Sequence, residues 1–379
     1  MRWSERWFAL RNRLLASPVF QRRAAAFALT RPIARRRARE LFDLVAGFVY
    51  SQVLLACVRL KLFDVLAEGP QTTPALAARL AMPPEAMQRL LAAAVSLRLV
   101  EPCSHGRYGL GRLGAPMVGN AAIAAMVEHH GALYADLSDP VALLRGDVQS
   151  AELARYWAYD AAQSTAASSS AADAASVERV RRYSALMTAS QPLVAGQILD
   201  AYPLARHRCL LDVGGGEGTF LAAAAARTPT LRLMLFDLPA VAERACARLA
   251  AQGLASRTTV TGGDFLRDPL PTGADIATLV RVVHDHNDPQ ALAILMAARR
   301  ALPIDGTLLL AEPMSDTPGA EPIGDAYFGF YLLAMGRGRP RTASELTSLL
   351  QAAGFGQIRL LPTRMPLQTG LLLARPACA

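Results

Sequence analysis

The sequence predicts an α/β protein with two domains: a helical, winged-helix-like domain near the N-terminus and a C-terminal domain built on a doubly wound parallel sheet. Two observations predict this class. A helix–turn–helix outline followed by a hairpin occupies residues 46–120, and apolar strands alternate with amphipathic helices over residues 201–379. The chain has 379 residues, 52% of them hydrophobic, which is enough for a core in each domain.

The winged-helix outline depends on helix start signals and a glycine turn. A Thr-Pro pair begins a helix over residues 75–80, as a capping residue followed by proline should, and a second proline begins a helix over residues 84–96. Apolar residues 97–100 and 108–110 then flank Gly106 and predict a hairpin. We expect a structural or dimerising role for this domain.

Seven strands are expected in the C-terminal, Rossmann-like domain. They are residues 209–213, 231–236, 258–261, 276–283, 307–311, 357–361 and 369–374. A helix over residues 177–199 leads into them, and an Ala/Ser segment of low complexity precedes it at residues 161–176. This segment predicts a mobile loop or frayed helix, with a substrate lid as the functional alternative. Residues 121–200 are therefore interpreted as a helical linker and lid region.

The net charge of +9 lies in the first 40 residues of an N-terminal arm, residues 1–45. Eleven arginines and two glutamates fall within the first 40 residues, so the remaining 339 residues carry 29 basic and 29 acidic groups. This distribution disfavours a nucleic-acid enzyme, which needs a basic face on its binding domain. Apolar residues recur at helical spacing from Trp3 to Leu14, and Pro18 and Pro32 break the arm into short amphipathic helices. Such an arm suits an anionic membrane surface or a partner subunit.

The composition indicates no secreted, metal-binding or membrane-spanning protein. The five cysteines are scattered without CxxC spacing, which argues against a disulfide framework or a zinc site. The first 40 residues contain no apolar signal-peptide core. The longest relevant uncharged run, residues 44–58, is shorter than the roughly 18 residues of a spanning helix and predicts a buried or interface helix. We expect a cytoplasmic protein, held peripherally at the inner membrane if the arm binds lipid.

A glycine-rich turn, Gly214-Gly215-Gly216, follows the first strand and precedes a helix. Glycines are needed where the backbone adopts positive φ and a ligand approaches without meeting a Cβ atom. About 20 residues later the second strand ends in Asp237, whose carboxylate can accept hydrogen bonds from both ribose hydroxyls of a nucleotide. At this point NAD and S-adenosylmethionine (SAM) are both candidate cofactors.

Three details favour SAM. The turn has G-x-G-x-G spacing, with Thr219 where the dinucleotide fingerprint requires its third glycine. The third strand is followed by Asp264 and Phe265, an acid for the adenine amino group beside a ring that can cover the base. A carboxylate rim that includes Asp212 also suits the sulfonium and ammonium groups of SAM, whereas it would repel the phosphates of NAD.

A histidine and a glutamate follow the fourth and fifth strands. In a doubly wound fold the carboxyl ends of the strands line the ligand crevice, so we expect His284 beside the cofactor. A neutral imidazole there can take the proton of an attacking hydroxyl as it meets the sulfonium methyl. Glu312 is expected to fix the tautomer of His284 and to stabilise its imidazolium form. We interpret His286 as a neighbour and His129-His130 as structural.

Together these motifs resemble the O-methyltransferases of the caffeate and acetylserotonin type over roughly residues 45–379. The motifs are Leu211-Asp212-Val213-Gly214-Gly215-Gly216, Asp237-Leu238-Pro239, Gly263-Asp264-Phe265, His284-Asp285 and Ala311-Glu312-Pro313. The resemblance implies a homodimer, SAM as cofactor and His284 as the base. The residues expected around SAM are Asp212, Gly214, Gly216, Asp237, Leu238, Asp264, Phe265, Arg281 and Ser190. Met187 and Tyr183 are expected on the substrate side.

The sequence departs from the plant members of this family at three positions. His286 replaces the usual tryptophan, Val280 replaces an adenine-side lysine, and residues 339–342 lack the second glutamate that plant enzymes set beside the base. More narrowly, the arm and the run Gly47–Cys57 resemble bacterial members that methylate the tertiary 1-hydroxyl of an acyclic carotenoid. This resemblance predicts a lipophilic small-molecule substrate.

Three other functions are weighed against this one. The same chemistry could act on a phenol or an aromatic polyketide. A winged-helix DNA-binding regulator that senses SAM is a second alternative, but the helix that would enter the groove offers only Gln88 and Arg89 as base-reading side chains. A family member that has lost methyl transfer is the third, which the pairing of His284 with Glu312 disfavours. We expect neither nucleic acid nor a metal ion as a partner.

Overall fold

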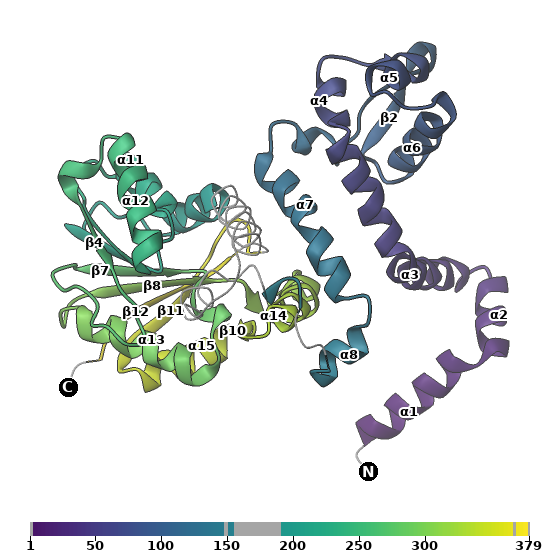
Figure 1. Ribbon diagram of the computed structural model, residues 1–379. Coiled ribbons are helices and arrows are strands. Elements are labelled where there is room, and N and C mark those ends of the chain that lie inside the picture. Colours follow the sequence, from purple (N-terminus) through teal and green to yellow (C-terminus); the bar gives the residue numbers. More distant parts are fainter. Residues whose placement is uncertain (1–2, 148–150, 155–190, 367–368, 378–379) are drawn as a thin grey trace. The chain divides into compact units, whose positions relative to one another are not determined.

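The computed structural model describes residues 3–147, 151–154, 191–366 and 369–377 (Figure 1). The chain divides into two compact units, residues 1–120 and 121–379. The expected site residues Tyr183, Met187 and Ser190 and the Ala/Ser segment lie outside the described residues. The finer division of the chain into four parts stays a prediction.

The first unit begins with three helices, α1 (Trp3–Ala16), α2 (Pro18–Ala26) and α3 (Arg31–Arg59). Both expected prolines lie in the first turns of helices, where a missing N–H costs nothing. Helix α3 nevertheless continues without a break through residue 45, and only two of its residues, Leu55 and Cys57, are buried. The run predicted as a buried or interface helix is therefore mostly half-buried or exposed in the single chain.

Helix α3 also meets the length and composition of a membrane span. Its most apolar 18-residue window has a mean hydropathy of 1.9 and is 11% buried, and it is the one such helix among the described residues. Long apolar helices of soluble proteins meet the same criterion. The feature therefore identifies an unusually apolar exposed helix.

The rest of the first unit has the predicted winged-helix outline. Its elements are α4 (Leu62–Ala67), β1 (Gln71–Thr72), α5 (Thr73–Arg79), α6 (Pro84–Ser96), β2 (Val100–Cys103) and β3 (Arg107–Leu110). The hydroxyl of Thr72 caps α5 by accepting a hydrogen bond from the Ala75 amide. The strands form an antiparallel sheet in the order β1-β3-β2.

The second unit is built on a seven-stranded sheet in the order β11-β12-β8-β7-β4-β5-β6. Its strands are β4 (Cys209–Val213), β5 (Arg232–Asp237), β6 (Thr258–Gly262), β7 (Ile276–Val280), β8 (Thr307–Glu312), β11 (Phe355–Leu361) and β12 (Gly370–Pro376). The five strands from β6 to β8 are parallel, whereas β12 is antiparallel to both of its neighbours. The chain order reverses at β4, which lies between β5 and β7, and such a switch point is where doubly wound folds bind ligands.

Helices cover both faces of this sheet (Figure 1). The helices α13 (Asp288–Ala301) and α15 (Ala343–Ala352) pack on one face, and α11 (Thr219–Arg227), α12 (Pro239–Ala251) and residues 191–201 pack on the other. Neighbouring strand residues take opposite faces, as Leu211 and Leu210 do. Both faces of the strands are apolar because both are buried.

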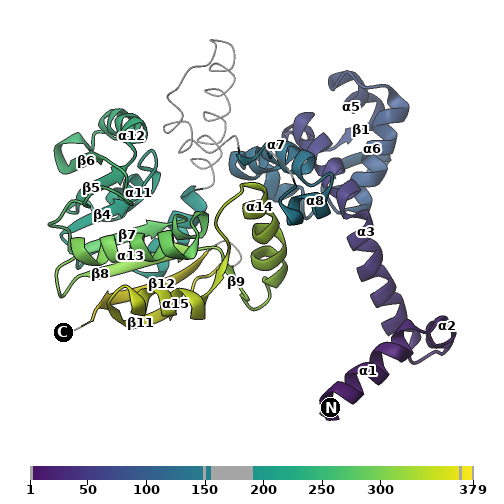
Figure 2. The same cartoon turned by 60° about the horizontal axis from the view of Figure 1, so that its bottom comes forward.

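A third group of helices in the second unit packs on its own small core (Figure 2). It contains α7 (Ala121–Asp136), α8 (Pro140–Arg145) and α14 (Gly329–Ala334), which follows a π-helical turn, η6 (Pro322–Phe328). Leu133, Leu143 and Leu332 are among the buried residues of this core. The group thus belongs to the same compact unit as the sheet.

The expected strand 276–283 is wrong at its end. Strand β7 stops at Val280 because Arg281 has a φ of 59°, which no strand residue adopts, and a 3-10 turn, η5 (Val283–Asp285), follows. The early stop places His284 beyond the end of the strand by a short turn, whereas the expected strand ended directly before it. The histidine is placed in a short turn just beyond the carboxyl edge of the sheet.

Candidate active site

The glycine turn after β4 is shaped by close packing on one side and open space on the other. Gly214, Gly216 and Gly218 all have positive φ. A Cβ atom on Gly214 would lie 2.8 Å from Cγ2 of Val282, whereas a Cβ on Gly216 would meet nothing within 4 Å. The turn is therefore pressed against Val282 and leaves open space at Gly216, as a cradle for a ligand requires.

Asp237, at the end of β5, holds this turn from the side. Its Oδ2 accepts a hydrogen bond of 2.8 Å from the Gly216 amide, and its Oδ1 accepts one of 2.8 Å from the Leu238 amide. The carboxylate is 1% exposed. Each carboxylate oxygen has a further lone pair, so Asp237 can accept from a ribose while it fixes the glycine turn.

Asp212 lies beneath the glycine turn. Its Oδ1 accepts a hydrogen bond of 2.7 Å from the Thr278 hydroxyl, while its buried Oδ2 has no hydrogen-bond partner among the residues that the structure describes. A Cβ on Gly215 would lie 2.7 Å from that oxygen. Burial raises the pKa of Asp212 to about 7. An unpartnered buried acid oxygen directly under the turn is suited to the cationic end of SAM, which the sequence argument assigned to it.

Asp264 and Phe265, expected on the adenine side, also make contacts within the chain. Asp264 caps its own turn, because its Oδ1 accepts from the Leu266 amide at 2.9 Å. Phe265 is 8% exposed and packs edge-on against the ring of His286, with 5.4 Å between ring centroids. Burial lowers the pKa of His286 to about 4, so this ring is neutral. It therefore fills the position of the usual tryptophan as an aromatic neighbour of Phe265.

His284 and Glu312 come together as expected. The Nδ1 atom of His284 lies 2.5 Å from Oε2 of Glu312, and both side chains are buried. The other oxygen of Glu312 accepts hydrogen bonds from the Val282 and Val283 amides at 3.1 and 2.7 Å. Glu312 therefore fixes the imidazole and the backbone that carries it.

Charges around His284 favour its protonated form. Burial alone would lower the pKa of His284, but the nearby carboxylates of Asp285 and Glu312 outweigh burial and raise it. The Nε2 atom lies 3.2 Å from Oδ1 of Asp285. Burial raises the pKa of Asp285 to about 6. The imidazole is consequently a stronger base than a free histidine, as acceptance of a proton requires.

Aromatic side chains extend away from His284 along η6 and α14. The ring of Phe328 packs edge-on against His284 at 6.3 Å, and Tyr327 packs against Phe328 at 5.0 Å. The hydroxyls of Tyr327 and Tyr331 pair with His130 and His129 at 2.9 and 3.0 Å. Both histidines have lowered pKa values, chiefly through burial. These pairs satisfy the polar atoms of an otherwise apolar aromatic group beside the imidazole.

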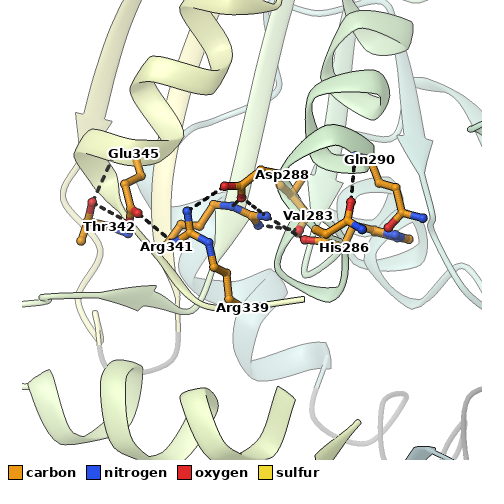
Figure 3. A network of polar contacts seen from close by, with 9 residues as sticks. Val283, His286, Asp288, Gln290, Arg339, Arg341, Thr342 and Glu345 are labelled. Carbon is orange, nitrogen blue, oxygen red and sulfur yellow. Dashed lines mark hydrogen bonds and ion pairs between the residues drawn. The ribbon is translucent and has the colours of Figure 1, made fainter. Parts of the chain in front are cut away.

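A buried arginine that the sequence did not single out lies behind this loop (Figure 3). The side chain of Arg341 is 1% exposed and binds the carboxylate of Asp288 and two backbone carbonyls of the loop that carries His284. Arg339 binds Asp288 and Glu345 from the exposed side. The segment that lacks the second glutamate of plant enzymes therefore has a different task in this chain.

The fold and the site define a SAM-dependent O-methyltransferase. Residues 134–356 match the O-methyltransferase domain and residues 42–120 match the O-methyltransferase dimerisation domain. The chain belongs to this family, with SAM as its cofactor and a dimerisation domain as its winged-helix part.

Two demethylspheroidene O-methyltransferases are similar to this chain. The chain is 45% identical to the demethylspheroidene O-methyltransferase of Cereibacter sphaeroides, over 97% of this chain and 95% of that protein. It is 38% identical to the enzyme of that name from Rhodobacter capsulatus, over 90% of this chain and 83% of that protein. Among solved structures, the SAH-bound form of CalO1, a methyltransferase in calicheamicin biosynthesis, is similar with a TM-score of 0.74 at 27% identity, covering 90% of this chain and 98% of that one.

The described residues fit SAM. The open side of Gly216, the carboxylate of Asp237 and the unpartnered oxygen of Asp212 surround the point where the strand order reverses. Arg281, also expected near the cofactor, donates its backbone amide to the Ala311 carbonyl at 2.8 Å. Within the described ranges, no cluster of His, Cys, Asp and Glu could hold a metal ion.

Proposed function

We propose that this O-methyltransferase methylates the tertiary 1-hydroxyl of an acyclic carotenoid of the demethylspheroidene type. The similarity to two demethylspheroidene O-methyltransferases supports the substrate class. The observation that carries the chemistry is the contact of 2.5 Å between His284 and Glu312. A tautomer held at Nδ1 leaves Nε2, which lies 3.2 Å from Oδ1 of Asp285, as the nitrogen that exchanges this contact for the acceptor hydroxyl.

In this proposal His284 is the general base. SAM, when bound, supplies an electrophilic methyl group on a sulfonium. A tertiary alcohol is far less acidic than a phenol, so His284 does not ionise it beforehand and takes the proton during or after methyl transfer. Glu312 then stabilises the imidazolium across the short contact at Nδ1. Burial of the pair excludes water that would compete for the proton.

The aromatic group beside His284 supports a lipophilic acceptor. Phe328 directly borders the imidazole, and its neighbours Tyr327 and Tyr331 have their hydroxyls paired with histidines. A conjugated polyene carries no hydrogen-bonding groups along its length, so a surface of apolar rings suits it. A phenolic substrate is the competing prediction, because an aromatic ring would also pack here.

Labelled SAM tests the proposal directly. Purified enzyme is given methyl-labelled SAM with either 1-hydroxy carotenoids in detergent or a set of phenols, and products are identified by mass. We expect label in the tertiary ether of the carotenoid. Labelled phenol ethers with no carotenoid product would refute the substrate class and leave the methyl-transfer chemistry intact.

We further propose that the basic arm contacts an anionic membrane. Its apolar side chains are exposed, among them Trp3 at 89% and Trp7 at 67%. Arg35, Arg36 and Arg39 line a shallow surface hollow on α3. Each basic residue held at an anionic leaflet contributes about 1 kcal/mol of binding free energy. Tryptophan side chains that become buried in the membrane interface add a hydrophobic contribution.

The limits of the family domains favour lipid over the second subunit as the partner of this arm. The dimerisation domain begins at residue 42, after the arginine-rich part of the arm. A protein that must collect a carotenoid also gains from residence at the membrane that dissolves it.

Co-sedimentation with vesicles tests this contact. We expect the full chain to bind vesicles that contain anionic lipid, with binding weakened by salt, and to ignore purely zwitterionic vesicles. Deletion of residues 1–40 should abolish binding and leave the dimer intact in ultracentrifugation. Undiminished vesicle binding by the truncated chain, or its dissociation to monomers, would contradict the proposal.

A further inference from the structure

We infer that Arg341 is a positioning residue for His284, acting through the backbone of the loop that carries the histidine. The inference rests on the proposed role of His284. Arg341 begins β10 (Arg341–Thr342), which pairs in parallel with β9 (Met314–Ser315) just beyond Glu312. The arginine thus comes from a part of the chain more than 50 residues beyond the loop that it binds (Figure 3).

Three acceptors surround the guanidinium. Nη1 donates to the Val283 carbonyl at 2.9 Å, and Nη2 donates to the His286 carbonyl at 2.7 Å. Nε and Nη2 also donate to Oδ1 of Asp288 at 2.9 and 2.7 Å. The two carbonyls stand on either side of His284 in the sequence. The rigid, planar guanidinium, with its several donors, therefore binds the backbone on both sides of His284.

The backbone that precedes Arg341 also contacts the loop that carries His284. The Arg339 amide donates to the His284 carbonyl at 2.9 Å. Gly338 has a φ of 75°, and a Cβ atom there would collide with that carbonyl oxygen. Residues 338–341 are therefore packed directly against the back of the loop, where a side chain at residue 338 could not fit.

The loop that carries His284 is bound both through its backbone amides and through its backbone carbonyls. Glu312 accepts from its amides, while Arg341 and the Arg339 amide donate to its carbonyls. Loss of the guanidinium would leave two carbonyls without their buried donor. Because proton transfer depends on atomic positions to within about 1 Å, loosening of this loop costs roughly 10- to 100-fold in kcat.

The charged and titratable groups that face His284 make the effect visible in a titration. They are Glu312 from β8, Asp285 from η5, Arg281 after β7 and His286 next in the loop, while η6 presents the apolar ring of Phe328. The pKa of His284 is raised because two carboxylates stay close. A loop that moves away from Glu312 lets this pKa fall toward the ordinary value.

Arg341→Met and Arg341→Lys test the inference. For Arg341→Met we expect kcat to fall roughly 10- to 100-fold, SAM affinity to remain within about twofold of wild type, and the acidic limb of the kcat–pH profile to move to lower pH. Lysine offers a single point donor instead of a fork, so Arg341→Lys should recover only part of the activity.

Arg257→Met is the matched control. Like Arg341, Arg257 donates to backbone carbonyls, in its case those of Ala225, Thr228 and Leu231. It lies in a different element, η4 (Ala255–Arg257). Its loss should lower the thermal midpoint without moving kcat or the pH limb. A kcat and pH limb of Arg341→Met equal to those of wild type, or altered equally in Arg257→Met, would overturn the inference. If Arg341→Met fails to fold, Arg341→Lys with wild-type kcat and limb overturns it.

Histidine NMR separates this inference from the proposed function. The ring signal of His284, assigned by its loss in His284→Gln, is titrated in wild type and in the folded Arg341 variants without any acceptor. A lower pKa in the variants supports the positioning role whatever the substrate is. An unchanged pKa refutes it, whereas full activity of His284→Gln would refute the base role alone.

Discussion

Nδ1 of His284 lies 2.5 Å from Oε2 of Glu312, although 28 residues separate them along the chain. The glutamate removes one imidazole nitrogen from reaction and raises the pKa of the other. Glu312→Gln should lower kcat about 100-fold and move the acidic limb of the kcat–pH profile to lower pH, because the carboxylate that raises the pKa of His284 is gone. Steady-state kinetics across pH measure both effects. The exposed Glu321, changed to Gln, serves as the control, and an identical loss there would count against the assignment.

His284→Gln should reduce methyl transfer roughly 10²- to 10⁴-fold, because no other residue is proposed to take the proton. SAM affinity, measured by calorimetry, should persist because the cofactor residues Asp237 and Gly216 are untouched. The exposed His105, changed to Asn, should leave both quantities unchanged. Wild-type turnover in His284→Gln would end the general-base role.

Asp212→Asn should make the stability of the folded protein depend less on pH between pH 4.5 and pH 7.5. The folded-state pKa of Asp212 is about 7, above its ordinary value of 3.8, so the unfolded chain ionises first as pH rises. This residue's contribution is therefore fully present below pH 4 and is lost toward pH 7, by about 4 kcal/mol at 1.36 kcal/mol per pKa unit. Thermal midpoints of the SAM-free protein at pH 4.5 and 7.5 should converge in the variant. Asp305→Asn, at an exposed site, should retain the wild-type difference.

His286→Phe should make the protein less sensitive to acid. The pKa of His286 is lowered from 6.5 to about 4, so the unfolded chain binds a proton first as pH falls. Stability is lost between pH 6.5 and 4, by about 3 kcal/mol on the same conversion. Phenylalanine keeps the edge contact with Phe265 and forfeits no hydrogen bond at the buried Nδ1, for which the described part of the chain supplies no partner. If the free energy of unfolding changed equally between pH 4.5 and pH 6.5 in His286→Phe and in wild type, the ring of His286 would not be neutral in the folded protein.

Gly216→Ala should reduce the affinity for SAM more than it reduces thermal stability. Its φ of 57° makes alanine strained by about 1 kcal/mol, but a Cβ there would point into open space. Gly253, with a φ of 73° and equally open surroundings, is the matched control at the end of α12. Both alanine variants should lose similar thermal stability, and only Gly216→Ala should lose calorimetric SAM affinity. Equal affinity in the two variants would place the cofactor elsewhere.

The sequence predicted most of the fold because local signals agree with it. The helix over residues 84–96 and the strand over 209–213 have the expected bounds, since proline, glycine and apolar runs mark them directly. The antiparallel direction of β12 was not predicted, because an apolar run buried on both faces looks alike in either direction. The early end of β7 was missed because a non-glycine residue, Arg281, takes the left-handed conformation.

The candidate site was predicted where motif residues follow strands, and missed where burial arises from distant packing. Asp237 and Glu312 end β5 and β8, and His284 lies in the turn that follows β7, so the sheet itself brings them to one edge. Arg341 belongs to an Arg-Pro-Arg-Thr run, and arginine side chains are mostly exposed in folded proteins. Its burial comes from acceptors more than 50 residues earlier in the chain, which no local pattern records.

Helix α3 has a mechanical consequence. Its 29 residues form one rod of roughly 43 Å at 1.5 Å per residue, rigidly joining the arginine-rich segment to the dimerisation domain. A dimer carries two such rods, so if each arm contacts a leaflet as proposed, two individually weak attachments become a bivalent one whose avidity exceeds either alone. Docking of both rods would also restrict the rotation of the whole dimer above the bilayer, which a flexible tether would not do.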